Sequence, residues 1–211
     1  YQIFDDMNQC SEQEIARLLN LVSTQRREQA LRYTHTFGQF CCLKSYEMLT
    51  ALLASTPYTL HPTPSFLYNE HGAPYLEDGP YFSFSHCKQG IAVAVSDTPI
   101  GIDIETIRPL NEGLVHKAMN LQEQAQIATA ANPAQEFIRL WTRKEAYVKL
   151  QGTGIISEMH NILSNTLGVT WEEILNTEKE YICTICKFLF MHIIKKESAR
   201  SPNKQNLSLR S

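Results

Sequence analysis

The chain has 211 residues, enough for one sizeable core or for two domains of about 100 residues each. Hydrophobic residues make up 43% and charged residues 19%, fractions that are typical of a soluble globular protein. A formal net charge of -3 excludes a general electrostatic attraction to nucleic acid or to an anionic membrane surface. Function must therefore come from a local site.

Six cysteines are scattered along the chain, and its first residues show no basic segment followed by an apolar one. Without the mark of a secretory signal peptide, we expect reduced thiols in a cytoplasmic protein and no disulfide framework. Cys183 and Cys186 form a CxxC pair, but no second pair stands at zinc-finger spacing. Alternation in YICTICKF points these two thiols to opposite faces of a strand, so a shared metal is not expected.

The N-terminal part of the chain predicts helices followed by strands. Residues 11–54 carry apolar side chains at helical spacing, starting from a capping box at Ser11. A proline-rich loop segment follows. Residues 81–86, YFSFSH, alternate as in a strand, and residues 91–96, IAVAVS, form a short apolar run suited to a buried strand. Asp97-Thr98-Pro99 then predicts a hairpin turn into the next strand.

The C-terminal part predicts helices over about residues 112–131 and 134–150, the second ended by Gln151-Gly152-Thr153-Gly154. Residues 181–194 are strand-like, and they are too short and too interrupted by charge to span a membrane. The tail from Lys195 carries five basic residues against one acid, so it is expected to be disordered. This order of elements predicts an α+β fold.

Residues 99–109, PIGIDIETIRP, place two carboxylates within an otherwise buried strand. Alternation sends the isoleucines to one face and Asp103 and Glu105 to the other, with their Cα atoms about 6.6 Å apart. Two acids this close repel each other and are costly to desolvate unless a cation compensates, which favours a divalent-metal site. A strand with one solvated face is the alternative, and these residues alone do not exclude it.

The helix QEFIRLWTRKEAYVKLQG carries a second group of charges. Glu145 and Lys149 lie four residues apart along the edge of its apolar stripe, where an ordinary surface ion pair is the alternative. Lys144 falls inside the stripe, so it must extend to water or meet an anion, and this helix edge is expected to face phosphate. Ser85 and His86 place a hydroxyl and an imidazole at a strand end, although a lone histidine is usually structural.

Together, FSFSH, GIDIE and WTRKEAYVK, in this order and at these separations, resemble the 4'-phosphopantetheinyl transferases of the two-lobed, surfactin-synthetase-activating type. The family pattern is a strand ending in SH, then G-I/V-D-I/V-E, then W/F-x-x-K-E-x-x-x-K. Weaker similarity runs from RREQALRYTH through NEHGAPYL to about Gly154. One such motif would be weak evidence, but three in register are specific to the family.

The resemblance implies a pseudo-dimer of two similar α+β lobes with the active site between them. Residues 1–98 would form the lobe on the side of the coenzyme A 3'-phosphate, and residues 99–194 the lobe with the metal and the catalytic helix, followed by the tail, 195–211. The activity implied is transfer of 4'-phosphopantetheine from coenzyme A to a serine of an apo acyl or peptidyl carrier protein, with release of 3',5'-ADP. Such a monomeric enzyme would serve fatty-acid, polyketide or nonribosomal-peptide biosynthesis in the cytoplasm, with no nucleic-acid or membrane partner.

The resemblance also assigns the metal site. Asp103, Glu105 and Glu145 would hold Mg²⁺, or Mn²⁺ in its place, against the pyrophosphate of coenzyme A. Catalysis would fall to Glu145, Lys149 and Asp103, since phosphoryl transfer needs neutralised oxygens and a base for the hydroxyl more than covalent catalysis. Either Glu145 or a water held by the acids could take the serine proton. Gly101 would leave room for the ligand to approach the backbone.

The same resemblance assigns the residues that bind the rest of coenzyme A. Lys149 and Lys144 would neutralise phosphate oxygens, and Arg26, Ser85 and His86 would bind the 3'-phosphate.

The chain departs from the family pattern at three positions. Ala73 stands in Gly72-Ala73-Pro74 where a lysine is common, and Gln29 and Cys42 stand where basic and hydroxyl residues are common. Weaker binding of coenzyme A is therefore expected, unless groups such as Arg32 substitute.

Two other functions remain open. One is a non-catalytic relative that binds coenzyme A or a carrier protein, although such a protein would not need clustered acids. The other is a metal-dependent phosphatase or nuclease, which would be expected to show ligands for a second metal or a basic surface.

Overall fold

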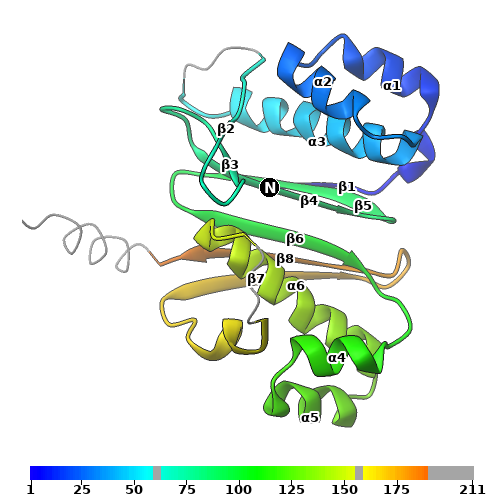
Figure 1. Ribbon diagram of the computed structural model, residues 1–211, viewed down its shortest axis with the longest axis vertical. Helices are drawn as coiled ribbons and strands as arrows, with labels where there is room; N and C mark the ends of the chain where they lie inside the picture. Colours follow the sequence, from blue (N-terminus) through cyan, green and yellow to red (C-terminus); the bar gives the residue numbers. More distant parts are fainter. Residues whose placement is uncertain (59–62, 155–158, 190–211) are drawn as a thin grey trace, which may run out of the picture.

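The computed structural model describes residues 1–58, 63–154 and 159–189. Within these ranges the fold mixes helices with antiparallel sheets, so the predicted α+β class is confirmed. Figure 1 shows the helices at the two ends of the molecule with the strands between them. The predicted tail from Lys195 and the end of the predicted last strand, 190–194, lie outside the described residues.

The N-terminal half packs helices on one side of a three-stranded antiparallel sheet. Serine side chains cap the first two helices, Ser11 on Glu14 N and Ser23 on Arg26 N. The helices are α1 (Glu12–Leu19), α2 (Thr24–Leu31) and α3 (Thr36–Ala54), after a short 3-10 turn, Met7–Gln9. The sheet order is β1 (Gln2–Phe4), β5 (Gly90–Ser96), β4 (Tyr81–Cys87), and β2 (Leu67–Tyr68) pairs separately with β3 (Pro74–Tyr75).

The C-terminal half repeats this scheme, with helices on the outer side of a second three-stranded sheet. Its sheet order is β6 (Ile100–Thr106), β8 (Tyr181–Phe188), β7 (Val169–Asn176). The helices are α4 (Glu112–Ala118), α5 (Leu121–Thr129) and α6 (Pro133–Gln151), followed by a 3-10 segment, η2 (Met159–Ser164). The predicted helix 112–131 is thus two helices, because Asn120 begins α5 in a reciprocal capping box with Glu123.

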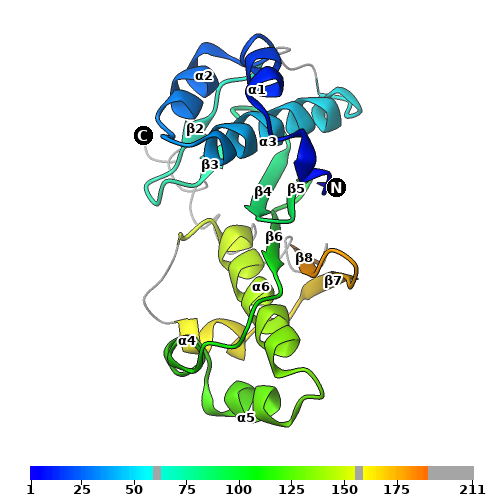
Figure 2. The same cartoon turned by 90° about the vertical axis from the view of Figure 1, so that its right-hand side faces the viewer.

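The predicted hairpin at Asp97-Thr98-Pro99 is wrong. β5 pairs with β4 and β1, whereas β6 pairs with β8, so this turn carries the chain from one sheet to the other. The reason is that the isoleucine face of β6, with Ile102 and Ile104, fills a separate core between the two sheets. Figure 2 shows β6 between the two groups of elements.

Serine side chains join β4 to β6 although the two strands belong to different sheets. The backbone N–H of Ile102 donates to Ser83 Oγ at 3.1 Å, and Ser85 Oγ donates to Asp103 Oδ1 at 2.7 Å. Ser83 and Ser85 lie two residues apart and therefore point to the same face of β4. The other face, which carries Phe82, Phe84 and His86, packs toward α3 and its neighbours.

Gly101 is needed for helix packing and does not open a path to a ligand, which corrects the expectation from sequence. A Cβ atom at this position would lie 1.9 Å from the carbonyl oxygen of Ala146 and 2.7 Å from the amide nitrogen of Leu150. Both atoms belong to the backbone of α6, which cannot yield as a flexible side chain would. The glycine thus lets α6 approach β6 closely enough for their polar side chains to meet.

The thiols of the CxxC pair point to opposite faces of β8, as predicted. All six are free, and Cys183 faces the core between the sheets while Cys186 faces the core under α6. The sequence did not predict strand β7, with the sequence VTWEEILN, nor the short strands β1, β2 and β3. None of the described helices is long and apolar enough to cross a membrane.

Candidate active site

Asp103 lies where β4, β6 and α6 meet, and only 3% of its surface is exposed. Its Oδ1 accepts hydrogen bonds from Ser85 Oγ and from Lys149 Nζ, both at 2.7 Å. Its Oδ2 is buried and has no hydrogen-bond partner among the described residues. Because an unsatisfied buried carboxylate oxygen is costly, this atom is the point of the site that calls for a ligand.

Glu105 and Glu145 flank Asp103 from the strand and from the helix. Burial raises the pKa of Glu105 to about 7, with the negative charge of Asp103 as the second cause and Arg108, 4.0 Å away, opposing it. Burial and then the charge of Asp103 likewise raise the pKa of Glu145, which Lys149 partly offsets. The acids therefore act on one another electrostatically, and a cation among them would favour their charged forms.

The residues fit a hard divalent cation in type and in charge. Their donors are carboxylate oxygens, which Mg²⁺ and Mn²⁺ prefer, and Asp103 Oδ2 is free to accept one. In the part of the chain that the structure describes, however, no three His, Cys, Asp or Glu side chains converge as ready-made metal ligands. The three acids are close enough to affect one another electrostatically, and the ammonium of Lys149 partly neutralises the charge of Asp103 at Oδ1.

Lys149 reaches the site from the last turn of α6. Its ammonium donates to Asp103 Oδ1 and, at 3.1 Å, to the carbonyl oxygen of Ile102, while 29% of its side chain stays exposed. The predicted ridge of Glu145 and Lys149 thus faces Asp103 instead of open solvent. The alternative of an ordinary surface ion pair does not describe this helix edge.

Lys144 contradicts its prediction as a phosphate-facing residue. Its side chain is fully buried, and its ammonium donates to Glu123 Oε2 at 2.8 Å and to the carbonyl oxygen of Met159 at 2.7 Å. Burial lowers its pKa, against the stabilising charge of Glu123. The sequence argument that this lysine must meet an anion was sound, but the anion is a carboxylate of α5.

Arg26 is also buried, with 4% of its surface exposed. Its guanidinium donates to the carbonyl oxygen of Cys42, to Ser45 Oγ and to Gln29 Oε1, and lies 5.3 Å from the ring centre of Phe84. No ion pair between Arg26 and a carboxylate occurs in the described ranges. Two of the departures from the family pattern, Gln29 and Cys42, are therefore hydrogen-bond partners of this unneutralised cation.

Ser85 and His86 separate because consecutive strand residues point to opposite faces. Ser85 belongs to the acid site, whereas His86 is exposed on the other face of β4, with its ring centre 6.2 Å from that of Phe37. Loss of hydration, and then the positive charges of Lys149 and Arg26, lower the pKa of His86. Ser85 is therefore separated from Arg26 and His86, for which binding of the 3'-phosphate stays a prediction.

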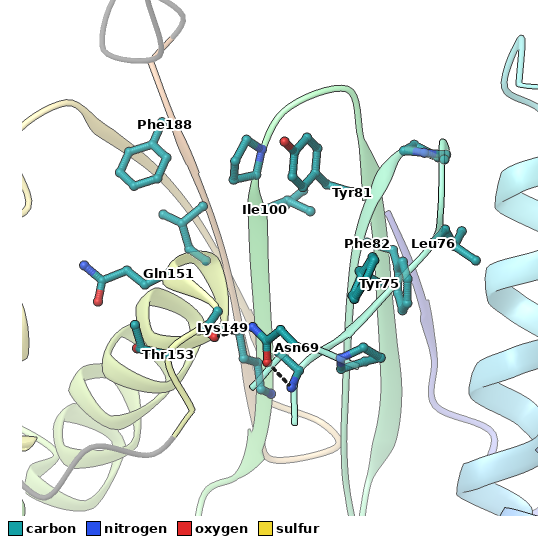
Figure 3. Close-up of a pocket in the computed structure, with 17 residues that line it drawn as sticks. Asn69, Tyr75, Leu76, Tyr81, Phe82, Ile100, Lys149, Gln151, Thr153 and Phe188 are labelled. Carbon is teal, nitrogen blue, oxygen red and sulfur yellow. Dashed lines mark hydrogen bonds between the residues drawn. The ribbon is translucent and has the colours of Figure 1, made fainter. Parts of the chain in front are cut away.

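Two cavities border the acid site. The larger, of about 820 Å³, lies between the β2–β3 hairpin, β6 and the end of α6, and Figure 3 shows Lys149 and Asn69 on its wall. The smaller, of about 340 Å³, is lined by Glu145, Lys149 and the loop that contains Ala73. The sequence did not single out Asn69; an asparagine two residues before His71-Gly72 was the available signal for a tight turn.

Comparison with known proteins identifies the family. A profile described as "4'-phosphopantetheinyl transferase superfamily" matches residues 99–188, which contain the acids and Lys149. The 4'-phosphopantetheinyl transferase AcpT of Salmonella typhimurium is 31% identical over 182 residues, covering 74% of this chain and 94% of that protein. The chain belongs to the 4'-phosphopantetheinyl transferase superfamily.

Longer members of the superfamily are similar too. The 4'-phosphopantetheinyl transferase ffp of Bacillus subtilis is 29% identical over 150 residues, which cover 69% of this chain and 66% of that protein. A further 4'-phosphopantetheinyl transferase of Bacillus subtilis is 32% identical over 145 residues, 66% of this chain and 64% of its own. The chain spans just under two thirds of these Bacillus transferases.

Proposed function

We propose that this protein transfers the 4'-phosphopantetheine group of coenzyme A to a serine of an apo acyl or peptidyl carrier protein and releases 3',5'-ADP. The observation that carries the proposal is the buried Asp103, with one oxygen held by Ser85 and Lys149 and the other without a partner. Acids on both sides of it give the site the charge that a metal bound to pyrophosphate would require. Membership in the superfamily supports this activity over other uses of such a site.

Asp103, Glu105 and Glu145 would hold Mg²⁺ or Mn²⁺, which would neutralise and polarise the pyrophosphate oxygens when bound. Lys149 would offset the negative charge that grows on the departing phosphate, because its half-buried side chain lines both cavities. Lys144 has no part in this assignment, since protein groups surround its ammonium.

The transfer breaks the phosphoanhydride bond in the pyrophosphate of coenzyme A and forms a phosphate ester with the carrier serine. The serine oxygen of the carrier attacks the phosphorus next to pantetheine, the bond from that phosphorus to the oxygen of 3',5'-ADP breaks, and the serine loses its proton. Either Glu145, which lines the smaller cavity, or a water held by the acids would receive this proton. His86 and the buried cation Arg26 would attract the 3'-phosphate from the side of α3.

The two halves would be the lobes of a pseudo-dimer, 1–98 and 99–194. In support, each half has a three-stranded antiparallel sheet with helices on its outer side, and the sheets face each other across a shared core. We further propose a monomer that acts in the cytoplasm on coenzyme A and a carrier protein.

Incubation with coenzyme A, Mg²⁺ and a panel of apo carrier proteins tests the activity. Mass spectrometry should detect phosphopantetheine on the carrier serine together with free 3',5'-ADP, because the reaction yields both. Full transfer in excess chelator would overturn the metal assignment. If no carrier is modified while coenzyme A still binds with micromolar affinity, the protein is a non-catalytic relative.

A further inference from the structure

The side chain of Asn69 joins the two halves of the molecule beside the acid site. Its Nδ2 donates to the carbonyl oxygen of Gly152 at 2.8 Å, across 83 positions of the sequence. Its Oδ1 accepts from the backbone N–H groups of His71 and Ala73, both at 2.9 Å. One amide thus folds the loop after β2 and ties that loop to the end of α6 (Figure 3).

The carbonyl that Asn69 binds terminates the turn that carries Lys149. Gly152 ends α6 with a φ of 67°, and its N–H donates to the carbonyl oxygens of Val148 and Lys149. Glycine adopts this left-handed conformation without strain, so the chain leaves the helix here and presents the Gly152 oxygen to the loop. A shift of this helix end would therefore also displace Lys149, which lies three residues earlier.

The contact is placed to affect geometry more than overall stability. Asn69 is exposed, so each of its hydrogen bonds adds only about 1 kcal/mol to the folded state. Yet the loop it fixes supplies Ala73 and Pro74 to the walls of both cavities, and Lys149 also lines both. Asn69 therefore links two segments that both line the two cavities.

We propose that Asn69 is a positioning residue, which clamps the loop 69–73 to the carboxyl end of α6 and thereby holds Lys149 against Asp103. The proposal rests on the transferase function proposed above. Asn69 lies outside the three motifs. Its amide donor would tie the loop to Gly152, whereas its acceptor would shape the loop itself.

Asn69→Asp and Asn69→Ala separate these two roles. Aspartate keeps an acceptor for the His71 and Ala73 N–H groups but loses the donor to Gly152, whereas alanine loses both. Asn20→Asp is the matched control, because Asn20 Nδ2 also donates to a carbonyl, that of Ala16, at the end of α1. We expect both Asn69 variants to speed amide hydrogen exchange in residues 148–154 about tenfold, while Asn20→Asp leaves that segment unchanged.

The variants should also lower kcat/KM for transfer about tenfold, mainly through kcat, with little change in the melting temperature. In a Lys149→Ala background, Asn69→Asp should cause no further loss, because both changes would remove the same interaction. Unchanged exchange in residues 148–154, additive losses with Lys149→Ala, or an effect confined to Asn69→Ala would each overturn the proposal. The hydrogen-exchange measurement needs no carrier protein. It therefore tests whether Asn69 holds the end of α6 even if the wild-type protein shows no transfer activity.

Discussion

Helix α6 carries two lysine–carboxylate pairs that differ in what surrounds them. Lys144 and Glu123 have side chains that are 0% and 8% exposed, and the lysine also binds a backbone carbonyl at 2.7 Å. Lys149 and Asp103 are 29% and 5% exposed, and Asp103 Oδ2 has no partner in the described residues. The first pair, which we call the closed pair, has all its charge satisfied by protein groups. The second, the open pair, keeps an unpaired carboxylate oxygen and borders space where a ligand can bind.

The difference shows that a lysine in a motif does not reveal its role by its position in the sequence alone. Lys144 lies next to Glu145 along the chain, but 100° per residue around the helix turns it toward α5 and η2. Lys149 is turned toward β6. We therefore expect changes at the closed pair to act on stability and changes at the open pair to act on transfer.

The largest effect is expected from Lys144→Met. It leaves the Glu123 carboxylate without its cation in the interior, so the free energy of unfolding should fall by about 3 to 5 kcal/mol. Denaturant titration measures this loss, and the double variant Lys144→Met with Glu123→Leu should recover much of it. The folded fraction of the single variant should retain transfer activity. Loss of activity in fully folded protein would support the original prediction that Lys144 binds phosphate.

At the open pair, Asp103→Asn should lower turnover by at least about 100-fold while the protein stays folded. The amide cannot supply a charged ligand at the Oδ2 position, yet its oxygen can still accept from Ser85 and Lys149. Steady-state transfer kinetics with calorimetric melting measure both properties. Glu173→Gln, which alters a carboxylate paired with Arg143 on the surface of the sheet, is the control and should keep activity. Comparable losses in both variants would contradict the assignment.

Glu105 should make stability depend on pH when divalent cations are absent. Its pKa is about 7 in the folded state against 4.5 as the ordinary value, so the folded state binds more protons between these values. The free energy of unfolding should therefore fall as pH rises from 4.5 to 7, by at most about 1.4 kcal/mol per pH unit.

Melting in chelator across this range measures that slope. Glu105→Gln should flatten it, and Mg²⁺ should restore stability above pH 7 by favouring the charged carboxylate. A slope that survives Glu105→Gln would assign the titration to another group.

The smallest effect is expected on the other face of β4. His86→Ala should reduce the preference for coenzyme A over dephospho-coenzyme A by about 1 to 2 kcal/mol, because it would remove the hydrogen bond that we propose to the 3'-phosphate. Calorimetric titration with both ligands measures this difference. Equal weakening of both would place His86 away from the 3'-phosphate.

Local patterns were sufficient for most elements of the fold. The capping box at Ser11 and helical spacing predicted helix over residues 11–54, which the structure divides into three helices. Alternation predicted β4, β6 and β8, and an apolar run predicted β5. Strand β7 escaped because VTWEEILN has acids and half-exposed apolar residues on both faces, and pairing with β8 is what stabilises it. The hairpin at 97–99 failed because turn chemistry does not specify which strand becomes the partner.

The sequence by itself determined which residues are candidates for the chemistry: two acids on one face of a strand, and a glutamate and a lysine on one ridge of a helix, as period 2 and period 3.6 require. Only the tertiary structure decided how these charges are used. In the structure Lys144 is paired with Glu123, and Arg26 is buried among uncharged acceptors. Gly101 allows the close contact with α6 in place of the expected contact with a ligand. The physical reason is that an ion pair or a close backbone approach depends on what packs opposite, and the partners lie far apart in the sequence, as Lys144 and Glu123 do.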